Sequence, residues 1–321
     1  MRLDFEQPSP VPSPQSPAPI QTIRAKVLGF CMGVRRAVEL ACNEAERSDH
    51  VYTLGPLIHN PQVLEDLKRR GIEILDENAL SSPNAALPQP YTIIIRAHGV
   101  GPHTEAALRK RGAAIIDATC PRVKASQLKA AAYAKAGYSL FLAGEETHAE
   151  VIGIRDYFTT GIHEPTCHVV GNAAEAKEAA AALQAQISDA KTALIGQTTI
   201  SMEEYQAIGN AIARFFPNLE IAQTICAATR ERQDSLRELL DMVDALIIVG
   251  GKDSANTRRL FAIAEKSGKP CVLVETAADI PPDFYNYAAT GAIGLSAGAS
   301  TPDAVIDAIE ADVSLIFSRM A

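Results

Sequence analysis

Three cysteines each stand directly before a stretch that predicts a helix. Cys120 follows a short apolar strand and comes just before a helix with proline in its first turn, Cys31 precedes a helical pattern over residues 34–47, and Cys226 precedes one over 229–243. Free N–H groups and the positive dipole end of a helix lower a thiol pKa, which favours a thiolate that binds metal or attacks an electrophile. The intervals of roughly a hundred residues, about the size of a small domain, predict three units that each deliver one thiolate to a shared centre.

Packing is the alternative for any single cysteine, because a free cysteine often behaves as a small buried hydrophobic residue. Cys42 lies within a helical pattern, and Cys167 and Cys271 lie in or beside strand-like runs. For these three we predict packing roles.

Three of the seven histidines, His59, His98 and His148, adjoin a glycine-bearing or capped turn at the end of an element. Histidine at such a position suits ligand binding or proton transfer. Glu150 lies two residues after His148, and a carboxyl whose pKa is raised by burial is a candidate proton donor. The remaining histidines lack such a context and are predicted to be surface or structural residues: His50, His103, His163 and His168.

Apolar runs typical of buried parallel strands position these residues. They cover residues 91–96, 138–143, 192–195, 245–249 and 292–295. In open parallel sheets ligands bind beyond the carboxyl ends of the strands, where helix N-termini present N–H groups to anions. The candidates at such ends are His98, His148, Glu150, Thr198, Ser254, Asn256 and Ser300. Ser254, Asn256 and Ser300 fit helix caps equally well.

Composition sets the outer bounds. A chain of 321 residues with 47% hydrophobic residues, 5% aromatics and no tryptophan suits two or three domains of helices packed on parallel sheets. The net charge of −8 argues against a nucleic-acid partner. No apolar run approaches the ~18 residues of a membrane span. Six cysteines without a dense framework indicate a reducing cytoplasm. Residues 1–22 are rich in proline, which predicts a disordered, dispensable tail.

These arguments lead to an α/β enzyme with a thiolate-bound metal centre and an anionic ligand. They do not name the metal, because the cysteine spacing matches neither zinc CxxC pairs nor a ferredoxin.

A set of motifs in order from about Ala25 to the C-terminus resembles the LytB or IspH family of hydroxymethylbutenyl diphosphate reductases. The motifs are Gly29-Phe30-Cys31-Met32-Gly33-Val34, His59-Asn60, Ala97-His98-Gly99-Val100, Asp117-Ala118-Thr119-Cys120-Pro121, His148-Ala149-Glu150, Gln197-Thr198-Thr199, Cys226-Ala227-Ala228-Thr229 with Arg232-Gln233, residues 250–256, and Ala297-Gly298-Ala299-Ser300. The sequence departs from the family pattern at Ala149, where proline is usual, at Ala255, where serine is common, and at Ala227, where an aromatic is frequent.

The resemblance implies three pseudo-threefold-related α/β domains with mostly parallel sheets around a central iron–sulfur site. We expect domains at 23–119, which includes the N-terminal strand, at 120–222 and at 223–321. The implied activity is the last step of the non-mevalonate isoprenoid pathway. Two electrons and two protons convert (E)-4-hydroxy-3-methylbut-2-enyl diphosphate to isopentenyl and dimethylallyl diphosphates.

The resemblance also implies the site residues. A [4Fe-4S] cluster would be held by Cys31, Cys120 and Cys226, with the fourth iron free of protein ligands. The diphosphate would be bound by His59, His98, Ser254, Asn256 and Ser300, with His148 close by. Glu150 would supply a proton, Thr198 would help to relay it, and Gln197 would orient the group. The electron donor would be a ferredoxin or a flavodoxin with its reductase.

Two alternatives remain from other classes. One is a zinc-dependent hydrolase that uses the cysteines and histidines, and the other is a non-enzymatic iron–sulfur sensor.

Overall fold

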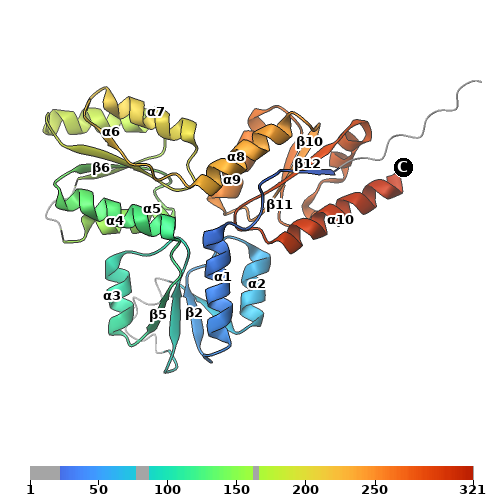
Figure 1. Cartoon of the computed structure of the whole chain (residues 1–321), viewed down its shortest axis with the longest axis horizontal. Helices are drawn as coiled ribbons and strands as arrows, with labels where there is room; N and C mark the ends of the chain where they lie inside the picture. The colour runs from blue at the N-terminus through green and yellow to red at the C-terminus, as the bar shows by residue number, and fades with distance from the viewer. Residues whose placement is uncertain (1–21, 77–86, 162–165, 321) are drawn as a thin grey trace, which may run out of the picture.

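The computed structural model describes residues 22–76, 87–161 and 166–320. It consists of three lobes, each built on a four-stranded parallel sheet with helices on its faces (Figure 1). The predicted α/β architecture of three domains with parallel sheets is therefore confirmed. Residues 1–21, most of the predicted proline-rich tail, and His163 lie outside the described residues.

The first lobe has the strand order β3-β2-β4-β5. Its strands are β2 (Val51–Leu54), β3 (Ile72–Leu75), β4 (Thr92–Ile95) and β5 (Ala114–Asp117), and its helices are α1 (Met32–Ala45), α2 (Pro61–Arg69) and α3 (Pro102–Lys110). Asn60 caps α2 by accepting a hydrogen bond from the Val63 amide, and Pro61 occupies the first helical position.

The second lobe has the strand order β7-β6-β8-β9. Its strands are β6 (Ser139–Ala143), β7 (Cys167–Val170), β8 (Thr192–Gly196) and β9 (Glu220–Ile221), and its helices are α4 (Pro121–Lys135), α5 (Ala149–Thr159), α6 (Ala173–Gln186) and α7 (Met202–Ala213).

The third lobe has the strand order β1-β12-β10-β11. Its strands are β1 (Thr22–Arg24), β10 (Ala245–Val249), β11 (Cys271–Val274) and β12 (Ile293–Ala297); its helices are α8 (Ala227–Leu240), α9 (Ala255–Lys266) and α10 (Asp303–Met320), with the 3₁₀ segments η2 (Ala277–Asp279) and η3 (Pro282–Thr290). The N-terminal strand pairs with β12, with Thr22 opposite Ile293. This corrects the prediction that the N-terminal strand belongs with the first domain.

The three sheets share one topology. In each sheet the first and third strands along the chain are central. The second strand lies at the edge beside the first, and the fourth lies at the edge beside the third. In the third sheet the N-terminal strand β1 occupies the position of the fourth strand. Each fourth strand leads into a cysteine: β1 into Cys31, β5 into Cys120 and β9 into Cys226. The three lobes are therefore arranged with pseudo-threefold symmetry, and the N-terminal strand completes the sheet of the C-terminal lobe. The residue bounds of the three domains stay a prediction.

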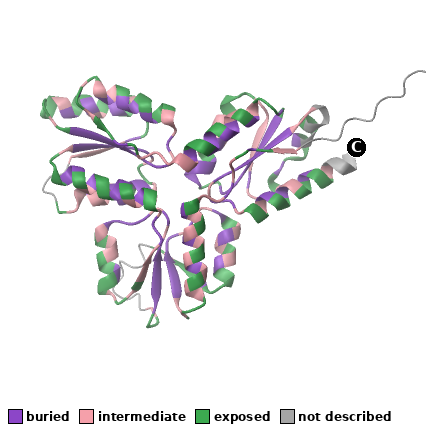
Figure 2. Ribbon diagram, viewed as in Figure 1, coloured by how far each residue is buried: buried purple, intermediate pink, exposed green. Residues whose placement is uncertain are grey.

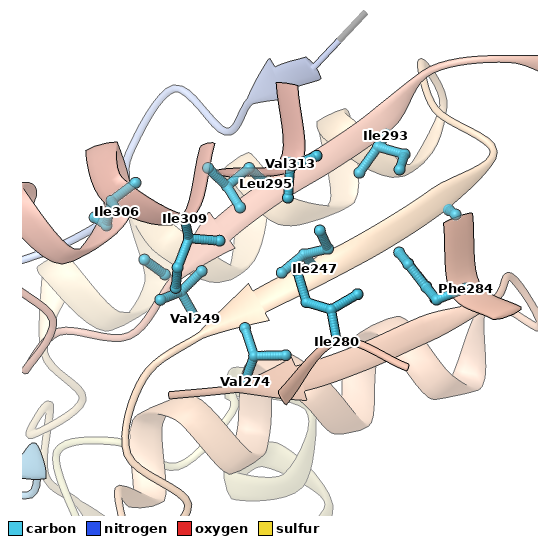
Figure 3. Close-up of a cluster of buried hydrophobic side chains, with 12 residues drawn as sticks. Ile247, Val249, Val274, Ile280, Phe284, Ile293, Leu295, Ile306, Ile309 and Val313 are labelled. Carbon is cyan, nitrogen blue, oxygen red and sulfur yellow. The ribbon is translucent and has the colours of Figure 1, made fainter. Parts of the chain in front are cut away.

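The central strands are buried along their whole length, whereas the helices expose their outer faces (Figure 2). In the third sheet, Ile247 and Leu295 pack on one face against Ile309 and Val313 of α10 (Figure 3). On the other face Ile248 packs among residues of α8 and α9. Helices on both faces explain the continuous apolar runs of these strands. The buried strands fix the positions of the loops at their carboxyl ends.

Candidate functional site

The three cysteines predicted to begin helices are the N-cap residues of α1, α4 and α8. The amides of Cys31, Cys120 and Cys226 each donate a hydrogen bond, of 3.1, 2.9 and 3.0 Å, to a carbonyl just past the third strand of the preceding sheet. The acceptors are Ala299, Ala97 and Thr198. The N-terminal ends of the three helices meet near the centre of the molecule (Figure 1). The repeated topology thus brings three distant thiols together.

One central cavity of about 100 Å³ is lined by every predicted metal-binding, substrate-binding and proton-transfer residue, although Gln197, predicted to orient the group, is not among the lining residues. The predicted residues that line it are Cys31, Cys120, Cys226, His59, His98, His148, Glu150, Thr198, Ser254, Asn256 and Ser300. They come from the carboxyl-end loops of all three sheets. Their roles in binding and catalysis are predictions, but the structure brings all of them together.

The acidity of the Cys120 thiol differs from the prediction. Burial raises its pKa, and the charges of Cys31 and Cys226 raise it further; the amides of Arg122 and Val123 act in the opposite direction but do not prevail. Three thiolates that line one cavity repel one another. A cationic group between them would remove that penalty, because a metal-bound thiol is deprotonated.

The donor types of the cavity bear on which metal group fits. Three thiols from separate segments of the chain line it, on Cys31, Cys120 and Cys226. Thiolates are the usual ligands of iron–sulfur clusters. All six cysteines of the chain are free.

The three histidines form a cluster. The ring centroids are 5.0 Å apart for His59 and His98, 5.0 Å for His98 and His148, and 6.2 Å for His59 and His148. Burial lowers the pKa of each, to about 4 for His148 and well below the usual value for His98. The rings are therefore neutral at pH 7. His148 Nδ1 accepts a hydrogen bond from the Glu150 amide, which leaves Nε2 as its N–H donor.

Glu150 is 1% exposed, and both of its oxygens bind Thr198. The Thr198 amide donates to Oε1 at 2.6 Å and the Thr198 hydroxyl donates to Oε2 at 2.9 Å. Burial raises the pKa of Glu150 to about 7, although the Thr198 hydrogen bonds and the charge of Arg259 each lower it. The predicted direction of the shift is confirmed. A carboxyl with this pKa gives and takes a proton near neutral pH.

The polar residues after β10 and β12 are partly committed to the fold. The Ser254 hydroxyl caps α9 by accepting a hydrogen bond from the Thr257 amide, so the cap prediction is confirmed for this residue. The Ser300 hydroxyl donates to the His59 carbonyl at 3.0 Å. Asn256 is 4% exposed, and neither its amide nitrogen nor its amide oxygen has a hydrogen-bond partner within the described part of the chain. A buried amide without partners is costly, so this side chain fits a ligand-binding role.

Two arginines contribute to the site but received no role from the sequence. Arg232, 4% exposed, lines the cavity and donates hydrogen bonds to the carbonyls of Gly29 and Ala228, which joins the Cys31 loop to the start of α8. Arg259 contacts Glu145 and Thr199 from the third lobe. Arg232 lies three residues after Thr229, so both side chains lie on the same face of α8. This spacing is the sequence signal that could have assigned Arg232 to the site. Arg259 contacts residues distant in sequence, and no local pattern shows such contacts.

The residues predicted to pack do so. Cys42, Cys167 and Cys271 lie against three different hydrophobic clusters, and His168 stacks on Phe141 with ring centroids 5.3 Å apart. Gln197 accepts a hydrogen bond from the Glu145 amide and donates one to Thr199, so it joins the loops after β6 and β8. Over the described ranges, no helix has the length and apolar character needed to cross a membrane.

Comparisons with known proteins agree with this geometry. The sequence model of a family described as LytB protein matches residues 22–314. The 4-hydroxy-3-methylbut-2-enyl diphosphate reductase of Treponema pallidum is 44% identical over 315 residues, which cover 89% of this chain and 81% of the relative. The reductase of the same name from Aquifex aeolicus is 37% identical, covering 92% of this chain and 97% of the relative.

Two solved structures are also similar. One is described as (E)-4-hydroxy-3-methyl-but-2-enyl diphosphate reductase, the terminal enzyme of the non-mevalonate pathway; it is 36% identical, with a TM-score of 0.64, and the match covers 92% of this chain and 99% of that one. The other is the E-1-hydroxy-2-methyl-but-2-enyl-4-diphosphate reductase from Plasmodium falciparum; it is 26% identical, with a TM-score of 0.79, and the match covers 90% of this chain and 86% of that one.

Proposed function

The chain belongs to the LytB family, whose relatives are 4-hydroxy-3-methylbut-2-enyl diphosphate reductases, and we propose how its site performs that reaction. The enzyme is an oxidoreductase of the non-mevalonate pathway. Its substrate loses the allylic hydroxyl as water while two electrons and two protons enter, and the products are isopentenyl and dimethylallyl diphosphates. One observation carries the assignment of residues: the thiols, the acid and the polar diphosphate-binding candidates line the same cavity.

Cys31, Cys120 and Cys226 would hold a [4Fe-4S] cluster with one iron free of protein ligands. One feature supports this: the three free thiols line one cavity. Such a cluster supplies the electrons and a Lewis-acidic iron for carbon–oxygen cleavage. Arg232 holds the Cys31 loop against α8 and so preserves the spacing of two of the thiols.

The diphosphate would be held by His59, His98, Ser254, Asn256 and Ser300, with His148 beside them. Neutral imidazole N–H groups, the partnerless Asn256 amide and the N-terminus of α9 are all suitable donors to phosphate oxygens. An acidic chain therefore binds a diphosphate without a cluster of lysines.

Glu150 would deliver the proton, with Thr198 as the relay. The two hydrogen bonds between them fix the carboxyl at the wall of the cavity. Since burial raises the pKa of Glu150 to about 7, a substantial fraction of this carboxyl is protonated at neutral pH. The departed hydroxyl takes up this proton to form water.

A second cavity of about 700 Å³ would admit the substrate. His59 and His148 line both cavities, while none of the three N-cap cysteines lines the second one. Arg96 and Arg258 lie along its wall together with the acids Asp76, Glu145 and Asp253, and Arg258 forms an ion pair with Glu145. The route for substrate therefore lies on the histidine side of the site.

An anaerobic determination of iron and acid-labile sulfide, followed by an assay with dithionite and a viologen mediator, tests this proposal. We expect about four iron and four sulfide per chain and reduction of the allylic diphosphate. A colourless protein with stoichiometric zinc would instead support a hydrolase, and a cluster without substrate reduction would support a sensor. We place the enzyme in the cytoplasm because its six cysteines are free thiols.

A further inference from the structure

Arg232 is the only buried arginine or lysine among the described residues. Its side chain is 4% exposed and lines the central cavity. The guanidinium donates to the Gly29 carbonyl through Nε at 3.2 Å and through Nη2 at 2.6 Å, and to the Ala228 carbonyl through Nη1 at 2.7 Å. All three acceptors are neutral, so none of these hydrogen bonds balances the positive charge.

A buried charge is costly unless an opposite charge lies beside it. In the part of the chain that the structure describes, Arg232 forms no ion pair with a carboxylate, and its neighbour Glu231 is exposed. By contrast Arg259, which is 18% exposed, is paired with Glu145. The charge that balances Arg232 is therefore to be sought in the cavity that its side chain lines.

Two of the three cavity thiols lie near this cation. Burial lowers the pKa of the Arg232 guanidinium, and the charges that oppose this effect are, in order of size, those of Cys31, Cys226 and Glu231. Arginine nevertheless keeps its proton in proteins. Thiolates at Cys31 and Cys226, or an anionic group bound to them, would supply the missing negative charge.

We propose that Arg232 is a positioning residue that sets the reduction potential of the cluster held by Cys31, Cys120 and Cys226. The inference rests on the proposed function, which places a cluster on these thiols. One electron from a low-potential donor makes the bound group more negative by one charge, and no bond forms or breaks in that step. A cation buried beside the group favours the more negative form, because opposite charges attract strongly where water is excluded.

The local charge is one of the features that set the potential of an iron–sulfur cluster. Arg232 therefore raises the potential, and it does so in addition to holding the Cys31 loop against α8. The two effects are separable, because a lysine keeps the charge without the paired contacts to the Gly29 carbonyl.

Arg36 provides a matched control for the loop contacts. Its guanidinium donates hydrogen bonds of 3.2 Å to the carbonyls of Thr119 and Asp117, so it holds the Cys120 loop as Arg232 holds the Cys31 loop. Arg36 is half-buried and is not among the residues that line the cavity. Arg36→Gln thus removes comparable loop contacts but no charge from the cavity wall.

Anaerobic titration with dithionite, followed by electron paramagnetic resonance, measures the potential without substrate. For Arg232→Gln we expect the reduction equilibrium to become at least tenfold less favourable, which is a fall of about 59 mV for one electron. Arg232→Lys and Arg36→Gln should both stay within that limit. An unchanged potential in Arg232→Gln, or an equal fall in Arg232→Lys or Arg36→Gln, overturns the proposal.

Iron content decides the case in which Arg232→Gln does not hold the cluster. Uptake of iron by Arg232→Lys and Arg36→Gln, but not by Arg232→Gln, would show that the positive charge is needed. Failure of Arg232→Lys as well would assign the loss to the loop contacts and overturn the proposal.

The titration requires no turnover, so it separates this inference from the proposed function. An unaltered enzyme that holds the cluster but does not reduce the allylic diphosphate refutes the function, while the potentials of the variants are still compared. Normal viologen-driven reduction together with equal potentials in all four proteins rejects the role of Arg232 alone.

Discussion

Within the described ranges no cation is bonded to Glu150, and its pKa is set mainly by burial, which raises it, and by two hydrogen bonds from Thr198, which lower it. Replacing the carboxyl by an amide keeps the shape but removes the proton. We expect Glu150→Gln to retain the full iron and sulfide content and to lose most turnover, by roughly 10²–10⁴-fold, as is usual for a lost general acid. Full activity of this variant in the viologen assay would remove Glu150 from the mechanism.

The pH dependence follows from the same residue. With a pKa of about 7, the carboxyl holds its proton below pH 7 and loses it above, so turnover should fall as the pH rises through about 7. The Thr198 hydroxyl stabilises the ionised form, so Thr198→Val raises the pKa and moves the fall to higher pH. Thr160→Val, whose hydroxyl binds only the Asp156 carbonyl at the end of α5, should leave the profile in place.

At the scale of residues, the sequence predicts which side chains line the cavity but not the pKa values of those side chains. A cysteine before a helix is visible in the sequence, and all three predicted cysteines are N-caps. The raised pKa of Cys120 is not visible there, because it depends on burial and on two thiols from remote segments. Arg259 was missed for the same reason.

At the scale of elements, α1 packs closely against Cys120 because Gly33, in its first turn, has no side chain. A Cβ added at Gly33 would lie 2.6 Å from Cys120 Sγ. We expect Gly33→Ala to displace either the helix or the thiol and to lower the iron content by at least half. Gly209→Ala is the matched control, because it lies within α7 and its added Cβ meets only flexible side-chain ends, Ile221 Cδ1 at 3.1 Å being the nearest. Equal iron content in the two variants would contradict the close approach.

The central strands were predictable and the shortest edge strands were not. The run at 245–249 matches β10 at both ends, because both faces of this strand are covered and every residue is apolar. The edge strands β1 and β9 have two or three residues and largely open burial patterns, so they carry little periodic signal. The sheet of β1 is set by a partner 271 residues away along the chain, Ile293 opposite Thr22.

At the scale of the whole molecule, the proposed cluster would join helices from all three lobes. A group that binds only the folded chain stabilises it by about 2.7 kcal/mol at 100 times its dissociation constant. Since each kcal/mol shifts Tm by about 2–4 °C in a domain of 150–250 residues, we expect Tm to fall by at least about 5 °C when a chelator removes the metal anaerobically. Scanning calorimetry of the loaded and stripped forms measures this.

Cys42→Ser is the control for that experiment, because Cys42 packs against the first-lobe core, away from the cavity. The loaded and stripped forms of this variant should differ by the same amount as those of the unaltered chain. Equal Tm values for the loaded and stripped forms of the unaltered chain would mean that the bound group does not join the lobes.

The pairing of β1 with β12 also sets the timing of maturation. β12 leaves the ribosome long after β1, and the amide of Cys31 finds its acceptor only once Ala299 has emerged. Until then the start of α1 lacks this hydrogen bond to the third lobe. The proposed cluster would accordingly be inserted only after β12 has been synthesised.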